Sequence, residues 1–217
     1  MGIICSGLDP ENYRSDKSLK LFQRMHRQLQ PVVIEPKNQE KIRGQSLDLS
    51  PVQKNLMKRY WQEAIMLSNN DIFHKTMLAS ITSSPKMNEI IACGSYCYRD
   101  LRKWPKLNKI CQAQFEWFQN IIISNLNENE VREKAVDLGR HHAKFAQYGL
   151  KPHFLDIYQL HLIKFLGKLK IENEEEKDEF LSCWITLMDF IVECMNFGYA
   201  QALTEAKQQR MQTIELR

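Results

Sequence analysis

Apolar residues recur every three or four positions through most of the chain after residue 49, and this helical period limits the fold more than any other feature. The first such stripe follows Ser50-Pro51, a pair that caps and opens helices. Its members are Val52, Leu56, Tyr60, Ala64 and Leu67. Turn formers are scarce, with 8 glycines and 7 prolines in 217 residues, and no segment has the pattern of a strand or of an internal repeat. The expected fold class is all-α.

Local start and stop signals place the other helices. The second is expected over 71–82, before the breaker Ser83-Ser84-Pro85. Three more are expected over 105–126, over 131–147 and from Pro152 onward. The last follows the acidic run 172–176, whose charge suits a helix N-terminus. Its inward residues are expected to be Trp184, Leu187, Met188, Ile191, Met195 and Ala202.

Composition and charge divide the chain into three parts and exclude several function classes. A polar, largely disordered leader is expected over 1–48, one folded domain over 49–206, and a polar tail over 207–217. The net charge of +4 comes from 30 basic and 26 acidic residues of interspersed sign, which does not indicate nucleic-acid binding. Six scattered cysteines are typical of a reducing compartment. No secretion signal or membrane-spanning apolar run stands out, so we expect a cytoplasmic protein.

The first six residues, Met1-Gly2-Ile3-Ile4-Cys5-Ser6, fit the pattern for N-myristoylation at Gly2. One acyl chain gives only marginal membrane binding, so a second signal is expected. We expect palmitoylation of Cys5 to supply this second signal. The basic residues of the leader add attraction to anionic lipid. The prediction is an anchor to the cytoplasmic leaflet of a membrane, and the alternative is an unmodified tail that merely begins Met-Gly.

The segment 131–145 places a histidine on an apolar stripe. The stripe runs through Val131, Ala135, Leu138, His142 and Phe145, at alternating steps of four and three residues. An inward imidazole needs either a polar partner or a metal, and imidazole is a good axial ligand for haem iron. From spacing alone, a core histidine hydrogen-bonded to a backbone carbonyl is the favoured interpretation, because inward histidines are common and cofactors are not. His141 lies to one side and is expected at the surface.

Four stretches of this chain resemble the globin family, and in particular the neuroglobin-like globins of nematodes and other invertebrates. They are Leu49-Ser50-Pro51 with Trp61, then Pro85, then Leu138-Gly139-Arg140-His141-His142, and finally Cys183-Trp184 through Gly198-Tyr199. Their order and spacing cover about residues 49–206. The resemblance implies a three-over-three helical sandwich that encloses haem b, with His142 as the proximal iron ligand.

The same resemblance assigns the other pocket residues. The helix from Pro105 has two adjoining apolar stripes and would be the distal helix, with Ile110 in the usual place of a distal histidine or glutamine and Gln114 one turn later. The remaining residues expected to contact haem are Met77, Ile91, Phe145 and Phe154. Ile91 and Ile110 depart from the family pattern, and Gln114 as an ordinary surface residue is an alternative. Without a hydrogen-bond donor on the distal side, the binding of oxygen to the iron is weaker by roughly a kcal/mol or more.

Cys93 and Cys97 form a candidate redox pair just before the distal helix, and two free thiols are the simpler alternative. We find neither a phosphate-binding glycine loop nor a nucleophile elbow, so a dedicated enzyme is not expected. The expected function is binding of a diatomic ligand (O2, NO or CO) for redox signalling, electron transfer or oxygen sensing at a membrane, with an electron donor or signalling protein as partner. The alternatives are an oxygen storage or transport globin and a haem-less interaction module.

Overall fold

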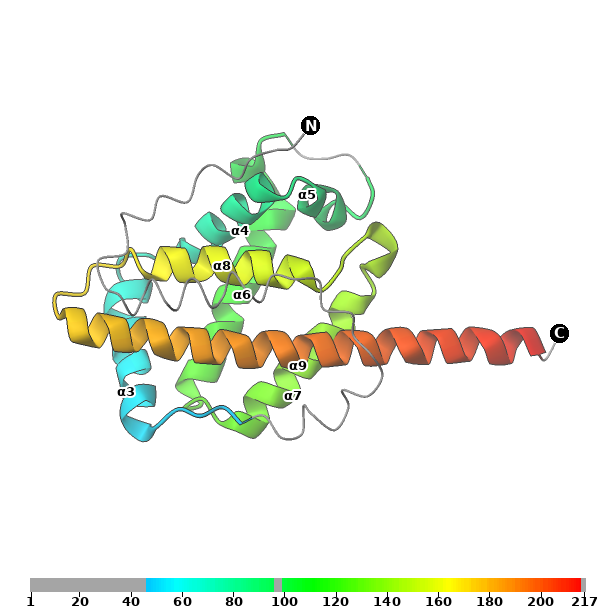
Figure 1. The fold of residues 1–217 in the computed structure, drawn as a ribbon. Coiled ribbons are helices and arrows are strands. Elements are labelled where there is room, and N and C mark those ends of the chain that lie inside the picture. Colours follow the sequence, from blue (N-terminus) through cyan, green and yellow to red (C-terminus); the bar gives the residue numbers. More distant parts are fainter. Residues whose placement is uncertain (1–45, 96–98, 216–217) are drawn as a thin grey trace, which may run out of the picture. The chain divides into compact units, whose positions relative to one another are not determined.

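The computed structural model describes residues 46–95 and 99–215, and within these ranges the chain is all-helical (Figure 1). The seven α-helices are α3 (Pro51–Tyr60), α4 (Ile72–Ser83), α5 (Lys86–Ile91), α6 (Pro105–Ile123), α7 (Glu128–Ala143), α8 (His153–Leu166) and α9 (Glu174–Glu215). A π-helical stretch, Trp61–Met66, continues α3, and short 3-10 helices lie at Leu101–Lys103 and Ala146–Tyr148. The predicted all-α class is confirmed. Residues 1–45 of the leader, including Gly2 and Cys5, lie outside the described residues, as does Cys97.

The helix starts follow the local signals. Ser50 caps α3 in a capping box with Gln53, and Pro51 is the first helical residue. Pro105 likewise opens α6, and Asn127 caps α7 by accepting a hydrogen bond from the Glu130 amide. The starts of α3 and α6 fall at the predicted residues because their signals lie only a few residues away, whereas α7 starts at Glu128, three residues before the expected Val131.

The core forms where the helices pack in pairs. α9 contacts α7, α3 and α8, while α4 lies between α6 and α8 (Figure 1). The five large apolar residues expected on the last helix, Trp184 through Met195, are all buried, and Ala202 is half-buried. Leu47 and Leu49 are buried too, so packing begins slightly before the expected domain start. Residues 207–215, expected as a polar tail, continue α9 as helix.

One expectation about membrane spans needs correction. α9 contains a window of 18 residues that is apolar enough, by length and composition, to cross a membrane. More than half of that window is buried inside the described domain, as happens in the core helix of a folded protein. Packing against α7, α3 and α8 is therefore sufficient to account for its apolar character.

Candidate functional site

The site is built around α7, which carries both buried and half-buried residues. Its buried residues are Val131, Ala135, Gly139 and Ala143, at regular steps of four. The predicted buried stripe is therefore only half right, because Val131 and Ala135 are buried whereas Leu138, His142 and Phe145 are half-buried. Phe145 also lies beyond the end of the helix at Ala143. The half-buried residues lie beside the buried ones, because His142 lines one small cavity together with Gly139 and with Met195 and Tyr199 of α9.

Two glycines let α7 and α9 approach backbone to backbone. A Cβ atom on Gly139 would lie 2.0 Å from the Met195 carbonyl oxygen, and one on Gly198 would lie 2.1 Å from the Val136 carbonyl oxygen. No side chain fits at such a distance. The crossing therefore requires glycine at both positions, and it fixes α7 three residues before His142.

His142 is held by its own helix. Its Nδ1 lies 2.7 Å from the Leu138 carbonyl oxygen, so the neutral ring carries its proton on Nδ1 and donates it there. Burial lowers the pKa of His142, the bond to Leu138 opposes that shift, and neighbouring His141 adds to it. The Nε2 atom has no hydrogen-bond partner among the described residues. A neutral imidazole with a fixed Nδ1 proton and a free Nε2 lone pair is the form that coordinates a metal.

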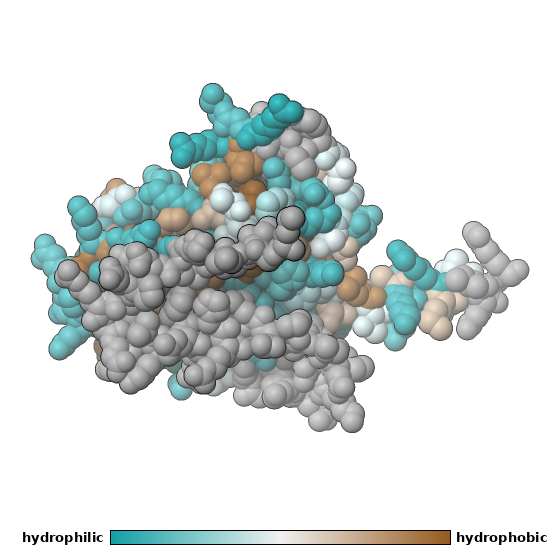
Figure 2. Space-filling view, turned by 45° about the horizontal axis from the view of Figure 1, so that its top comes forward, coloured by the Kyte–Doolittle hydropathy of each residue, from teal (hydrophilic) through white to brown (hydrophobic). Residues whose placement is uncertain are grey.

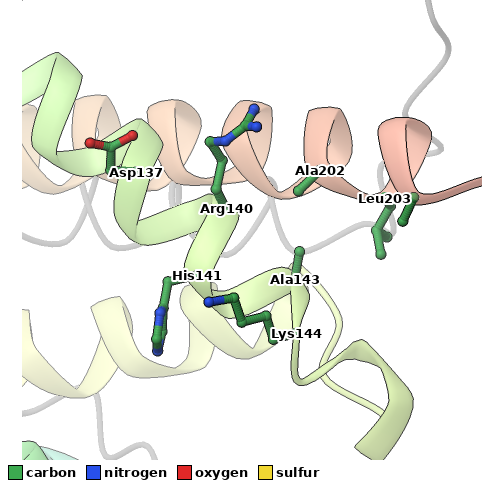
Figure 3. A pocket seen from close by; sticks show the side chains of 8 residues that line it. Asp137, Arg140, His141, Ala143, Lys144, Ala202 and Leu203 are labelled. Atoms are coloured by element: carbon green, nitrogen blue, oxygen red, sulfur yellow. The ribbon is translucent and has the colours of Figure 1, made fainter. Parts of the chain in front are cut away.

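His141 has a different environment, as predicted. It is exposed, and it lines a surface pocket between the end of α7 and the C-terminal part of α9 (Figure 3). Arg140 reaches across this pocket region to Glu205, with nitrogen–oxygen distances of 3.2 and 2.7 Å. The two adjacent histidines thus face different parts of the domain.

The remaining predicted pocket residues divide into a half-buried and a buried group. Ile91 ends α5, Ile110 and Gln114 lie on α6, and all three are half-buried. The Phe145 ring, also half-buried, lies 6.4 Å from the His142 ring, centroid to centroid. By contrast, the predicted haem contacts Met77 on α4 and Phe154 on α8 are buried in the apolar core. Their contact with haem stays a prediction.

A polar pair between α6 and α8 was not predicted from the sequence. The Tyr158 hydroxyl donates a hydrogen bond to Oε1 of Gln114 at 3.3 Å. Burial raises the pKa of Tyr158 well above its usual value, and the nearby Cys111 thiol adds to the shift. Tyr158 nevertheless keeps accessible surface. The helical spacing of Leu155, Tyr158 and Leu162 was the available signal, but it gives no indication of a partner on α6.

The cysteines are free among the described residues. Cys93 is half-buried, adopts a left-handed backbone conformation with φ of 56°, and accepts a hydrogen bond from Lys106 Nζ at 3.2 Å. Burial raises the pKa of Cys111 and of Cys183 to about 12. The predicted redox pair stays untested, because Cys97 lies outside the described residues.

Comparison with known proteins identifies no relative: no protein-family profile matches the chain, and no curated protein matches it significantly.

Proposed function

We propose that this chain is a globin that binds haem b through Nε2 of His142. The observation that carries the proposal is the state of this one side chain: its imidazole is neutral, its Nδ1 proton is fixed by the Leu138 carbonyl, and its Nε2 has no partner among the described residues. A carbonyl bond of this kind sets the tautomer and raises the basicity of a ligating histidine.

The surroundings favour haem over a metal ion held by the protein alone. Among the described residues, no group of three or more histidine, cysteine, aspartate or glutamate side chains is arranged to hold a metal. A single imidazole therefore needs a cofactor that brings its own ligands, and a porphyrin supplies four nitrogens. The Phe145 ring lies beside His142, and the half-buried side chains of Ile91 and Ile110 would offer further apolar contacts to the flat surface of such a cofactor.

Haem, when bound, supplies an iron that binds O2, NO or CO and changes oxidation state. The chain's own residues would have simple roles beside it. His142 would hold the iron, while Ile91, Ile110 and Phe145 would exclude water. Gln114 is the candidate donor toward a bound ligand, because its Oε1 already accepts from Tyr158 and its amide N–H groups can donate elsewhere.

The isoleucine at position 110 makes bulk oxygen carriage the weaker alternative. An aliphatic side chain cannot donate a hydrogen bond, so bound oxygen would depend on Gln114 alone. We therefore prefer redox signalling, electron transfer or oxygen sensing at a membrane surface, with the acylated leader as the anchor. Rapid autoxidation of the ferrous protein would support this role. A stable and reversible oxygen complex would instead support oxygen storage or transport.

The direct test is the absorption spectrum of the purified full-length protein. We expect an intense Soret band, either as purified or after addition of hemin. His142→Gly should abolish or grossly alter the band, and added imidazole should restore it by entering the space left by the side chain. A colourless protein that takes up no hemin contradicts the proposal and leaves the haem-less interaction module.

His141→Gly is the matched control. It makes the same change one residue away, at an exposed side chain on the pocket of Figure 3, so its Soret band should stay nearly intact. Equal spectra for the two variants would show that His142 is not the ligand.

The anchor has its own test. The wild type, expressed in a eukaryotic cell, should sediment with membranes, and Gly2→Ala should become soluble because the myristoyl acceptor is removed. Equal partitioning of the two proteins would contradict acylation without affecting the haem proposal.

A further inference from the structure

Five exposed basic side chains lie within residues 99–109, at the point where α6 begins. They are Arg99, Arg102, Lys103, Lys106 and Lys109. Asp100 is the single acidic residue in this segment, which we call the basic segment. Figure 2 shows strongly hydrophilic residues at the top of that view, directly above a group of hydrophobic ones. Nothing in the proposed haem site uses these charges.

The positive charge of the basic segment is poorly compensated. Lys103 pairs with Asp100 at 3.4 Å, and the other four cations have no ion pair among the described residues. Elsewhere among the described residues, seven of the 16 lysines and arginines have an ion-pair partner, as Lys75 has in Asp71 and Lys134 has in Glu130. α6 also has no acidic residue in its first turn, so the positive end of its helix dipole adds to the same potential. Such crowding of like charge costs stability unless an anionic partner relieves it.

The apolar side chains of the basic segment favour a lipid surface over a protein partner. Trp104 and Leu107 are buried, and Leu101 is half-buried. The exposed large apolar residues of the described domain all lie elsewhere: Val52, Met66, Leu67, Ile123, Leu203 and Met211. A protein interface needs an apolar centre that excludes water. Attraction to anionic headgroups needs none, because it acts through the surface potential over a Debye length.

We propose that the basic segment is a membrane-docking surface that binds anionic phospholipid headgroups. It acts in addition to the leader and holds the folded domain itself against the bilayer. The proposal does not depend on haem binding, so either one can fail without the other.

The test is co-sedimentation of the full-length, unacylated protein from bacteria with phospholipid vesicles. The vesicles contain about one-third phosphatidylserine in phosphatidylcholine, at an ionic strength of about 0.1 M. Neutralising four charges of the basic segment should lower the partition coefficient about 10- to 100-fold. The substitutions are Arg102→Gln, Lys103→Gln, Lys106→Gln and Lys109→Gln. Binding of the wild type should fall at high salt and on pure phosphatidylcholine.

A matched control removes the same amount of charge from other exposed positions. Its substitutions are Lys168→Gln, Lys170→Gln, Lys207→Gln and Arg210→Gln. Both variants keep every basic residue of the leader and take the net charge of +4 to zero. We expect the control to retain at least half of the wild-type partition coefficient. Equal losses in the two variants would show a net-charge effect, and no loss in either would assign membrane binding to the leader; each result overturns the proposal. Circular dichroism of both variants verifies that they are folded.

Discussion

Two groups of residues on and just after α7 differ in how closely they pack. Gly139 brings the helix so close to α9 that a Cβ atom would meet the Met195 carbonyl oxygen at 2.0 Å. Leu138, His142 and Phe145 keep accessible surface, although His142 lines a small cavity together with Gly139 and Met195. The small residues of this helix therefore set its closest packing, while its larger side chains stay partly accessible.

The same contrast separates the two neighbouring histidines. His141 is exposed and lines the surface pocket between α7 and α9. By contrast, burial lowers the pKa of His142 and so favours its neutral ring. A helix that turned by one residue would exchange these environments. The close crossing with α9 therefore decides which of the two imidazoles is the more buried one.

The largest effect is expected from closing the glycine contact. Gly139→Ala places a Cβ atom against the Met195 carbonyl, so the two helices must separate. We expect a loss of about 3 kcal/mol in the free energy of unfolding, at the upper end for overpacked sites. Urea denaturation followed by circular dichroism measures it. A loss under about 1 kcal/mol would mean that the crossing is not close-packed.

Gly167→Ala is the control for this prediction. A Cβ atom at Gly167 would have its nearest neighbour at 3.5 Å, which is ordinary contact, and φ is −64° there. The alanine should stabilise the protein by about 0.5 kcal/mol, because it restricts the unfolded chain.

The second prediction concerns Phe145, whose ring lies beside that of His142. Phe145 is half-buried, so Phe145→Ala should cost about 1–2 kcal/mol without hemin, less than the ~3–5 kcal/mol of a fully buried phenylalanine. With hemin bound the cost should increase, because the ring then loses contacts with the cofactor as well. Thermal unfolding with and without hemin measures the difference. Phe165→Ala, at a half-buried residue of α8, should cost the same in both states.

The third prediction tests the polar pair. Tyr158→Phe removes the hydroxyl that donates to Gln114 and leaves the amide oxygen without that donor. We expect a loss of about 1 kcal/mol in unfolding free energy, and a faster dissociation of oxygen from the ferrous protein as Gln114 loses its fixed orientation. Stopped-flow absorbance measures the rate. An unchanged rate together with the stability loss would restrict Tyr158 to a packing role.

The smallest effect is expected at the ion pair between α7 and α9. Arg140 and Glu205 are each well exposed, and such pairs commonly contribute little. Arg140→Ala should therefore leave the urea midpoint close to that of the wild type. A large decrease would show that the ion pair, and not the glycine contact, holds α7 against α9.

The helix starts and the fold class could be predicted because their signals are local. Ser50, Pro51 and Pro105 act within one turn, and the breaker at Pro85 separates two helices wherever they later pack. The placement of His142 on an inward stripe was predicted in part. Counting large apolar side chains selected Leu138 and Phe145, but the most closely packed positions of the helix are Gly139 and Ala143.

By itself, the sequence determined the all-α class, the starts of α3 and α6 and the presence of one histidine on an apolar stripe. The tertiary structure alone decided which face of α7 meets α9, because a close crossing selects small residues according to the partner's backbone, and no hydropathy pattern records that partner. It also decided that Tyr158 meets Gln114, 44 positions apart in the chain. Contacts over such separations depend on how whole helices pack, and short-range spacing contains no information about them.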